Sequence, residues 1–118
     1  MDELTLKALG DPKRYNLLRL LSERAYCVGA LAVRSGMSES AVSQHLKILR
    51  EAGLVSGEKR GYYTHYQVNK EALQQVIAQL SALLQMDREP CDSPFHGCPE
   101  AAAIRCKAYI AQENNTKE

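Results

Sequence analysis

Residues 38–55 read SESAVSQHLKILREAGLV, and this stretch predicts one short amphipathic helix. Cap-type serines open it, and apolar residues recur at helical spacing through Val42, Leu46 and Leu49. Gly53 follows as a helix stop. The opposite face carries hydrogen-bond donors and positive charge without any aliphatic side chain: Ser43, Gln44, Lys47 and Arg50.

The polar face of this predicted helix suits a groove of DNA. Glutamine can pair with adenine through two hydrogen bonds, lysine and arginine reach guanine or phosphate, and serine hydroxyls bond to either. The alternative is a helix surface that only faces solvent. The residues of this helix that we expect to contact DNA are Ser38, Ser40, Ser43, Gln44, His45, Lys47 and Arg50. For His45, packing inside the protein is the alternative to a DNA contact.

Directly after this helix, residues 54–68 read LVSGEKRGYYTHYQV. Two β-prone runs flank a turn that contains Lys59, Arg60 and Gly61, so the segment predicts a hairpin with a basic tip. A recognition-type helix followed by such a hairpin is a winged helix-turn-helix. The predicted fold class is therefore mainly α with a small β-hairpin. The hairpin residues expected to contact DNA are Lys59, Arg60, Tyr62 and Tyr63.

Three predicted helices precede the recognition-type helix. The first is short and ends before Gly10. The second begins at Pro12 after a capping Asp11 and runs to about Arg24. Its expected core residues are Tyr15, Leu17, Leu18, Leu20 and Leu21. The third spans 28–35 and completes the helix-turn-helix.

A fifth helix, predicted from Glu71 to Met86, has a complete apolar stripe. The stripe consists of Leu73, Val76, Ile77, Leu80, Leu83 and Leu84. So small a domain offers too little core to bury all of it, so we expect the first and fifth helices to form a homodimer interface. A two-fold dimer also explains how two recognition helices reach successive major grooves. The alternative is that the stripe packs only on its own core.

The chain of 118 residues is long enough for one domain of ordinary size. We divide it into a DNA-binding and dimerisation domain at 1–86 and a cysteine-bearing extension at 87–118, with a terminal helix near 99–112. Residues 1–69 carry ten basic and seven acidic side chains, whereas residues 70–118 carry five and seven. The positive excess lies with the DNA-binding motif, but it is modest, so phosphate affinity should depend on two copies acting together.

Three cysteines, Cys91, Cys98 and Cys106, fall within 16 residues of the extension. No apolar run is long enough to span a membrane and no signal-peptide pattern is present, so we expect a cytoplasmic protein, in which cysteines are more often ligands or reactive thiols than disulfides. A helix over both Cys98 and Cys106 would separate them by about 12 Å. That exceeds what one metal ion with thiolate bonds of about 2.3 Å can bridge. Cys98 must therefore lie in the loop, or Cys106 must serve elsewhere.

We expect at least two of the tail cysteines to form a thiol-based sensor site, with Cys27 as a candidate further ligand. For Cys27 the alternative is a buried cysteine that acts as a small hydrophobe. Thiolates select soft cations such as cadmium, lead, copper(I) and zinc. Four cysteines would also satisfy an iron–sulfur cluster. Two tail cysteines could instead form a metal-free disulfide switch.

Three segments of the chain resemble the ArsR family of metal-sensing winged-helix repressors. They are ALGDPKRYNLLRLL at 8–21, AYCVGALAVRSGMSESAVSQHLKILREAGLV at 25–55 and KRGYYTHYQVN at 59–69. The resemblance covers about Leu6 to Leu84. It implies a repressor that leaves its operator when an inducer binds, and it adds trivalent arsenic and antimony to the candidate inducers.

The resemblance also bears on the metal ligands. Many metal sensors of the family carry Cys-Val-Cys-Asp at the start of the third helix, where this chain has Cys27-Val28-Gly29-Ala30. A two-cysteine site within that helix is therefore excluded. The family's zinc site on the fifth helix uses histidines and carboxylates, and residues 71–87 contain no histidine. We expect His65 in the hairpin to pack or to face DNA rather than to bind metal.

The predicted function is a homodimeric transcriptional repressor that binds double-stranded operator DNA and is released when cysteine thiolates capture a soft metal or metalloid. One alternative is a repressor of the same fold that senses redox state or sulfur species through an iron–sulfur cluster or a dithiol. Another is a winged-helix adaptor that binds proteins. An enzyme is not expected, because the sequence has no Cys-x-x-Cys pair and no nucleophile–base arrangement.

Overall fold

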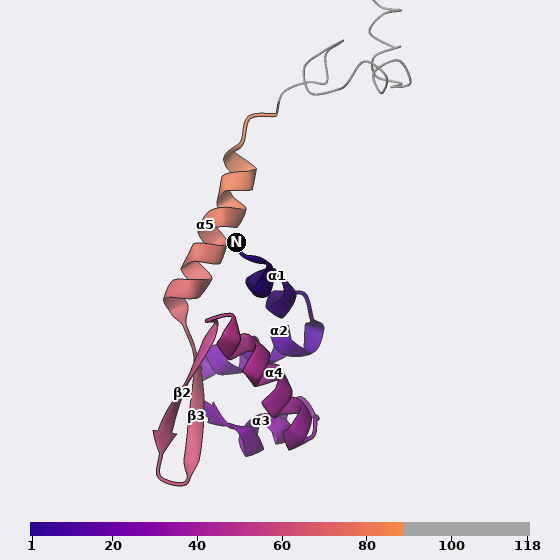
Figure 1. The fold of residues 1–118 in the computed structure, drawn as a ribbon, viewed down its shortest axis with the longest axis vertical. Helices are drawn as coiled ribbons and strands as arrows, with labels where there is room; N and C mark the ends of the chain where they lie inside the picture. Colours follow the sequence, from indigo (N-terminus) through magenta and orange to yellow (C-terminus); the bar gives the residue numbers. More distant parts are fainter. Residues whose placement is uncertain (89–118) are drawn as a thin grey trace, which may run out of the picture. The chain divides into compact units, whose positions relative to one another are not determined.

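The structure is a computed structural model that describes residues 1–88. Its elements in chain order are α1 (Glu3–Leu9), α2 (Pro12–Glu23), β1 (Tyr26–Cys27), α3 (Val28–Ser35), α4 (Glu39–Glu51), β2 (Val55–Arg60), β3 (Tyr63–Val68) and α5 (Lys70–Gln85). Within the described residues this order confirms the mainly α winged helix-turn-helix (Figure 1). The predicted terminal helix and three candidate ligands, Cys91, Cys98 and Cys106, lie outside the described residues.

Side-chain caps fix where three of the helices begin. Asp2 accepts a hydrogen bond from the N–H of Thr5 at 2.8 Å at the start of α1. Asp11 accepts from the N–H groups of the next helix, and Pro12 occupies its first turn, as predicted. The Ser38 hydroxyl accepts from the N–H of Ala41 at 3.1 Å. Each bond satisfies a backbone donor that the first helical turn leaves unpaired.

Helix α4 ends where the sequence predicts, at a glycine in the left-handed conformation. Gly53 has a φ of 76° and donates to the carbonyl of Arg50 at 2.9 Å, while Leu54 donates to that of Leu49 at 3.0 Å. These two bonds form a Schellman motif. The chain thus leaves α4 in a fixed direction and passes straight into the first wing strand.

The core is mainly aliphatic, with Tyr26 as its buried aromatic residue, and lies between α1 to α4 and the sheet. Its fully or nearly fully buried side chains include Leu17, Leu18, Leu20, Leu21, Leu31, Val42, Leu46, Leu49, Leu54 and Val55. The expectation that Tyr15 belongs to this core is wrong, because its side chain is 62% exposed. At about 100° of rotation per residue, Tyr15 falls on the side of α2 opposite the leucine stripe.

The wing is a hairpin, but the sheet has a third strand that the sequence analysis missed. Strand β1 pairs antiparallel with β3, which gives the order β1-β3-β2. Two residues are too short for an alternating pattern to be visible in the sequence. Cys27, expected simply at the start of the third helix, is both the second residue of β1 and the residue preceding α3.

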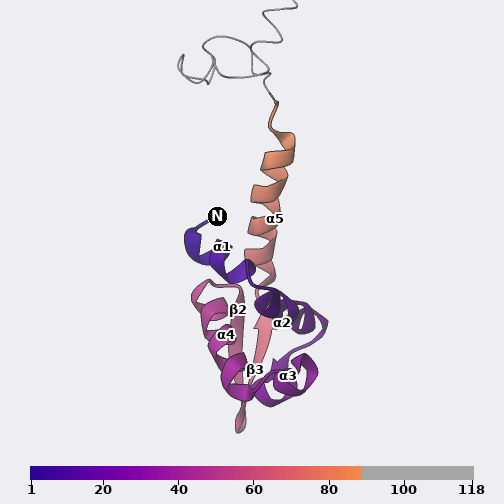
Figure 2. The same cartoon turned by 90° about the vertical axis from the view of Figure 1, so that its right-hand side faces the viewer.

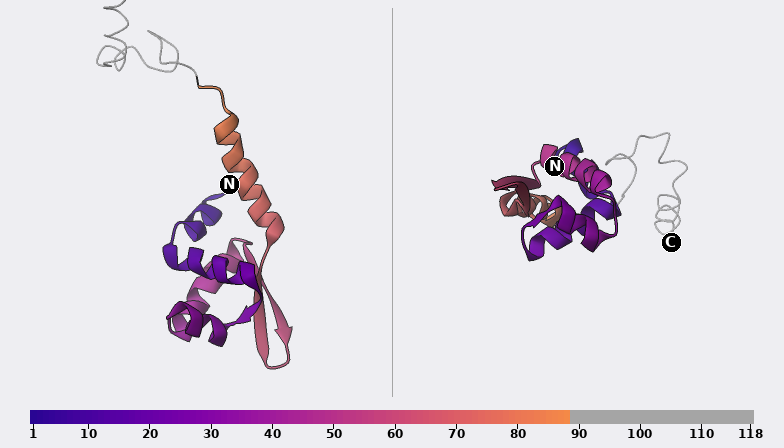
Figure 3. Two further views of the ribbon diagram at one scale, coloured as in Figure 1. Left: turned by 180° about the vertical axis from the view of Figure 1, so that it is seen from behind. Right: turned by 90° about the horizontal axis from the view of Figure 1, so that it is seen from below.

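Helix α4 is held by three other helices, since it contacts α1, α2 and α3. Figure 2 shows α3 and α4 side by side, with the two wing strands running past them. The left panel of Figure 3, seen from behind relative to Figure 1, shows the tip of the wing extending past α3 and α4. The helix-turn-helix and the wing therefore belong to one packed body, which includes residues up to Leu84.

Candidate nucleic-acid interface

The outward face of α4 is the polar surface that the sequence predicted. Ser43, Gln44, Lys47 and Arg50 are all exposed. On the inward face, Val42 and Leu49 are 0% exposed and Leu46 is 1% exposed. Because buried aliphatic side chains fix the rotation of α4, the four polar residues are presented to the outside as a set. Ser38 and Ser40 are exposed at the start of the helix, although the Ser38 hydroxyl serves as the cap.

His45 does not belong to this outward face. Its ring is half-buried, and its Nδ1 atom lies 3.3 Å from a terminal nitrogen of Arg14 on α2. Of the two alternatives for His45, a DNA contact or packing, its position fits packing. The sequence pattern alone gave no signal for this contact, because Arg14 is 31 residues away in the chain.

The tip of the wing differs in detail from the prediction. The register pairs Arg60 with Tyr63, so only Gly61 and Tyr62 form the loop. Gly61 has a φ of 63° and Tyr62 a negative φ, the pattern of a type II′ turn. Lys59 and Arg60 therefore lie on the end of β2 and not in the turn.

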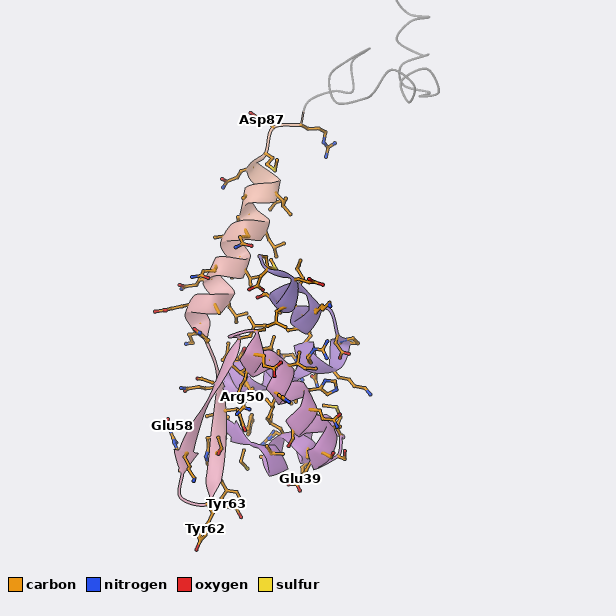
Figure 4. The ribbon with its side chains drawn as sticks, viewed as in Figure 1. Glu39, Arg50, Glu58, Tyr62, Tyr63 and Asp87 are labelled. Carbon is orange, nitrogen blue, oxygen red and sulfur yellow. The ribbon has the colours of Figure 1, made fainter. Side chains whose placement is uncertain are left out.

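Exposure and charge vary along the wing. Tyr62 is fully exposed and Tyr63 is 65% exposed, and Figure 4 shows both at the tip, away from the helices. Arg60 forms an exposed ion pair with Glu58, at 3.5 Å. Exposed pairs of this kind contribute little to stability, so Arg60 can exchange the carboxylate for a phosphate at small cost.

A contact links the recognition helix to the wing. The guanidinium of Arg50 lies over the ring of Tyr66 in β3, 6.0 Å from its centroid. Gly57 in the neighbouring strand makes room for that ring, because a Cβ atom at this position would approach it to 3.1 Å. The contact is within the range of a cation–π interaction and orients Arg50 beside the wing.

Cys27 is the one candidate metal ligand that lies within the described residues. It is a half-buried free cysteine, opposite His65 in the β1–β3 register. His65 is also half-buried, and its Nδ1 atom has no hydrogen-bond partner among residues 1–88. In this part of the chain no three His, Cys, Asp or Glu side chains are placed to hold a metal ion. Within the described residues of a single chain, Cys27 is therefore not part of a three-ligand metal site.

A second exposed surface is apolar and lies on α1 and α5. Its large side chains, between 40% and 89% exposed, are Leu4, Leu6, Ile77, Leu80, Leu83 and Leu84. Residues of α1 and α5 line a common hollow of about 210 Å³ together with Ala52 and Leu54. The two helices therefore lie side by side (Figures 1 and 2). No helix in the described residues is long and apolar enough to cross a membrane.

Comparisons with known proteins agree with this geometry. The family described as "Bacterial regulatory protein, arsR family" matches residues 11–56. The nodulation protein NolR of Rhizobium meliloti is 36% identical over 84 residues, which cover 71% of this chain and 69% of that protein. The arsenical resistance operon repressor of Bacillus subtilis (strain 168) is 33% identical over 78 residues, covering 65% of this chain and 74% of the repressor.

Solved structures show the same fold. A crystal structure described as a possible transcriptional regulator for arsenical resistance shares 35% sequence identity, with a TM-score of 0.63 over 70% of this chain and 85% of that one. The homodimeric winged helix-turn-helix DNA-binding domain of Mb0332 from Mycobacterium bovis superposes with a TM-score of 0.60, over 76% of this chain and 85% of that domain. Its identity is 24%, so it supports the fold alone.

The helix-turn-helix with its wing places the protein in the winged-helix class of transcriptional regulators. The chain belongs to the ArsR family of transcriptional repressors. The matched family is described as regulatory proteins and the Bacillus subtilis relative is named a repressor, in agreement with the expectation of a regulator rather than an enzyme.

Proposed function

We propose that this protein is a homodimeric repressor that binds operator DNA through α4 and the wing. The observation that carries the proposal is the outward face of α4, where Gln44, Lys47 and Arg50 are exposed in a row while the opposite face is locked into the core. These side chains can reach base edges and phosphates in the major groove. Lys59 and Arg60, at the end of β2, supply further positive charge along the same molecule.

The proposed dimer uses the apolar surface of α1 and α5. Exposed side chains such as Ile77, Leu80 and Leu83 repeat at helical spacing, and a stripe of this kind is typical of an interface rather than of a solvated surface. A symmetric pair presents two copies of α4 to the DNA. Two copies also double the modest positive charge of residues 1–69.

The DNA-binding proposal is tested by selecting duplexes from a random-sequence pool with the purified protein. We expect one sequence, with two related half-sites, to be enriched, and its affinity to fall steeply with salt because bound phosphates release counterions. Gln44→Ala should lower affinity for the selected duplex by about tenfold, since a good base contact contributes about 1 to 3 kcal/mol of discrimination. Gln74→Ala, an exposed glutamine on α5, is the matched control. A pool that stays random would contradict DNA reading and favour a protein–protein adaptor.

The proposed inducer site consists of the tail cysteines, with Cys27 as a candidate partner. Thiolates favour soft cations and arsenite, and relatives named for arsenical resistance make arsenite the first inducer to test. We expect Cys91→Ser or Cys98→Ser to leave duplex binding intact and to abolish release by arsenite or cadmium. Full release in both variants would exclude these cysteines as the sensor. Loss of release in Cys27→Ser would show that the site joins the tail to β1.

An iron–sulfur cluster or a dithiol switch is the alternative sensor. Protein purified without oxygen and examined by elemental analysis and absorption spectroscopy separates the candidates. Iron and sulfide with visible absorption indicate a cluster. A metal-free protein that releases DNA under an oxidant and loses two titratable thiols indicates a disulfide.

A further inference from the structure

Arg14, near the start of α2, contacts two other helices, α1 and α4, as well as the residue that caps its own helix. Its Nε donates to the carbonyl of Ala8 at 2.9 Å, and one terminal nitrogen donates to the carbonyl of Lys7 at 2.8 Å. The other terminal nitrogen lies 3.3 Å from Nδ1 of His45 in α4 and 3.9 Å from the carboxylate of Asp11. The side chain is only 14% exposed, and its contacts with Ala8 and His45 are partly buried.

The chemistry of these contacts requires an arginine. Lys7 and Ala8 lie in the last turn of α1, where carbonyl groups run out of helical partners. A planar guanidinium has five N–H donors in a fixed fork and can serve several acceptors at once, whereas a lysine ammonium is a point donor on a flexible stem. Arg14 therefore ties the end of α1 to α4 across α2, and a lysine at this position could not make all of these bonds together.

The contact is a hydrogen bond in only one tautomer of His45. Arginine has no acceptor, so the bond exists only if Nδ1 of His45 offers its lone pair, and the ring proton is then on Nε2. Because this bond is directional, it adds to the constraint that the buried aliphatic side chains already place on the rotation of α4. His45 directly precedes Leu46 in the core and follows Gln44 on the outward face, so a rotation at His45 moves the proposed DNA-contacting side chain.

We infer that Arg14 is a positioning residue that sets the orientation of α4 relative to α1 through its hydrogen bond to His45. The inference rests on the proposed function, in which α4 reads DNA and α1 belongs to the dimer interface. Arg14 then forms a direct polar link between the two proposed surfaces. A change in the position of α1 within the dimer would then reach the recognition helix through Arg14, in addition to the direct packing of α1 on α4.

The test measures affinity for the duplex selected by the wild-type protein and for a scrambled duplex of the same composition. Arg14→Lys and His45→Leu should each lower affinity for the selected duplex by about tenfold, the size expected for a hydrogen bond to a charged group. Affinity for the scrambled duplex should change less than about twofold. His45→Asn should retain wild-type affinity, because its side-chain oxygen can take the place of Nδ1 as acceptor.

Two comparisons separate positioning from general destabilisation. The double variant Arg14→Lys, His45→Leu should be no weaker than the weaker single variant, since the bond between Arg14 and His45 is already lost in Arg14→Lys. Arg19→Lys is the matched control, because Arg19 lies on the same helix, is exposed and pairs only within it. Equal losses on both duplexes, additive effects of the two changes, or a loss in His45→Asn as large as in His45→Leu would each overturn the inference.

The same experiment distinguishes failure of the inference from failure of the proposed function. If Gln44→Ala lowers affinity for the selected duplex while the Arg14 and His45 variants do not, α4 reads DNA and Arg14 has no positioning role. If Gln44→Ala and the Arg14 and His45 variants all bind the selected duplex like the wild type, α4 is not the reading element and both fail.

Discussion

Helices α4 and α5 have similar aliphatic stripes, yet the structure treats them in opposite ways. In α4, Val42, Leu46 and Leu49 are at most 1% exposed. In α5 no residue is buried, and Ile77 and Leu83 are 62% and 65% exposed. The apolar side of α4 is buried within its own chain, so only its polar side is exposed to a binding partner. No other part of the described residues 1–88 covers the apolar side of α5.

This difference shows that an apolar stripe predicts a buried helix face but does not identify the surface that covers this face. Helix α4 is enclosed by α1, α2 and α3. Helix α5 reaches the core only at its beginning, where Ala72 and Leu73 pack against it. The free energy available from burying the rest of the stripe therefore favours association with another surface. In the proposed dimer that surface is the same helix of a second copy.

The largest expected effect is on the buried side of α4. Leu46→Ala should lower the free energy of unfolding by about 2 to 5 kcal/mol, because it removes buried methyl groups and leaves a cavity. The measurement is chemical denaturation followed by circular dichroism. Val33→Ala is the matched control on α3, where the side chain is 84% exposed, and should change stability by less than about 0.5 kcal/mol. If the two variants lost equal free energy of unfolding, the burial of Leu46 would not explain its contribution to stability.

The next effect concerns the uncovered side of α5. Ile77→Glu should weaken dimerisation at least about hundredfold, because an unpaired carboxylate would be buried in the interface. Sedimentation velocity over a dilution series measures this, with circular dichroism to show that the helices persist. Gln74→Glu adds the same charge at an exposed polar position of α5 and should leave the dimer intact. A wild-type protein that is monomeric at all concentrations would contradict the proposed interface.

A smaller effect is expected from the charges on the two helices. Lys47→Ala on α4 should lower affinity for the selected duplex by about tenfold and reduce the slope of its salt dependence by about one phosphate contact. Lys70→Ala at the start of α5 removes the same charge outside the proposed interface and should change neither quantity. Matching losses in the two variants would show that net charge, rather than the face of α4, determines binding.

The smallest effect comes from the helix caps and depends on pH. The N–H of Arg14, together with that of Lys13, donates to Asp11 and lowers the pKa of this carboxyl below its ordinary value of 3.8. A carboxyl whose pKa is lowered in the folded protein contributes to stability at pH values above its ordinary pKa. This contribution is lost as the pH falls through the lowered pKa. Asp11→Ala should therefore lower the melting temperature at neutral pH and show a smaller further loss in acid.

The control for this pH dependence is the cap of α4. Ser38 caps that helix with a hydroxyl that does not titrate in acid. Ser38→Ala should lower the melting temperature by a similar amount at neutral pH while keeping the acid limb of the wild type. Melting curves of both variants between about pH 2 and about pH 7 measure the difference. The role of Asp11 would be contradicted if its variant kept the full acid limb.

The sequence predicted the elements whose signals are local. Asp11-Pro12 and Ser38 fix helix starts through bonds to residues two or three positions away. Gly53 and Gly61 adopt left-handed conformations that few other residues tolerate, which is why the end of α4 and the wing turn could be located in the chain. The exposure of Tyr15 could also have been predicted from the sequence. At about 100° per residue, Tyr15 lies on the side of α2 opposite the leucine stripe and therefore outside the core.

What the sequence determined by itself is thus the run of helices, the wing and the polar face of α4, because bonds and periodicities within a few residues encode them. Only the tertiary structure decided the pairing of β1 with β3, the position of His45 against Arg14 and the exposure of the α5 stripe. These depend on contacts between residues some 30 to 40 positions apart, or on the lack of a neighbour within the described chain. Such contacts form only when the chain folds, and the sequence pattern around either residue does not predict them.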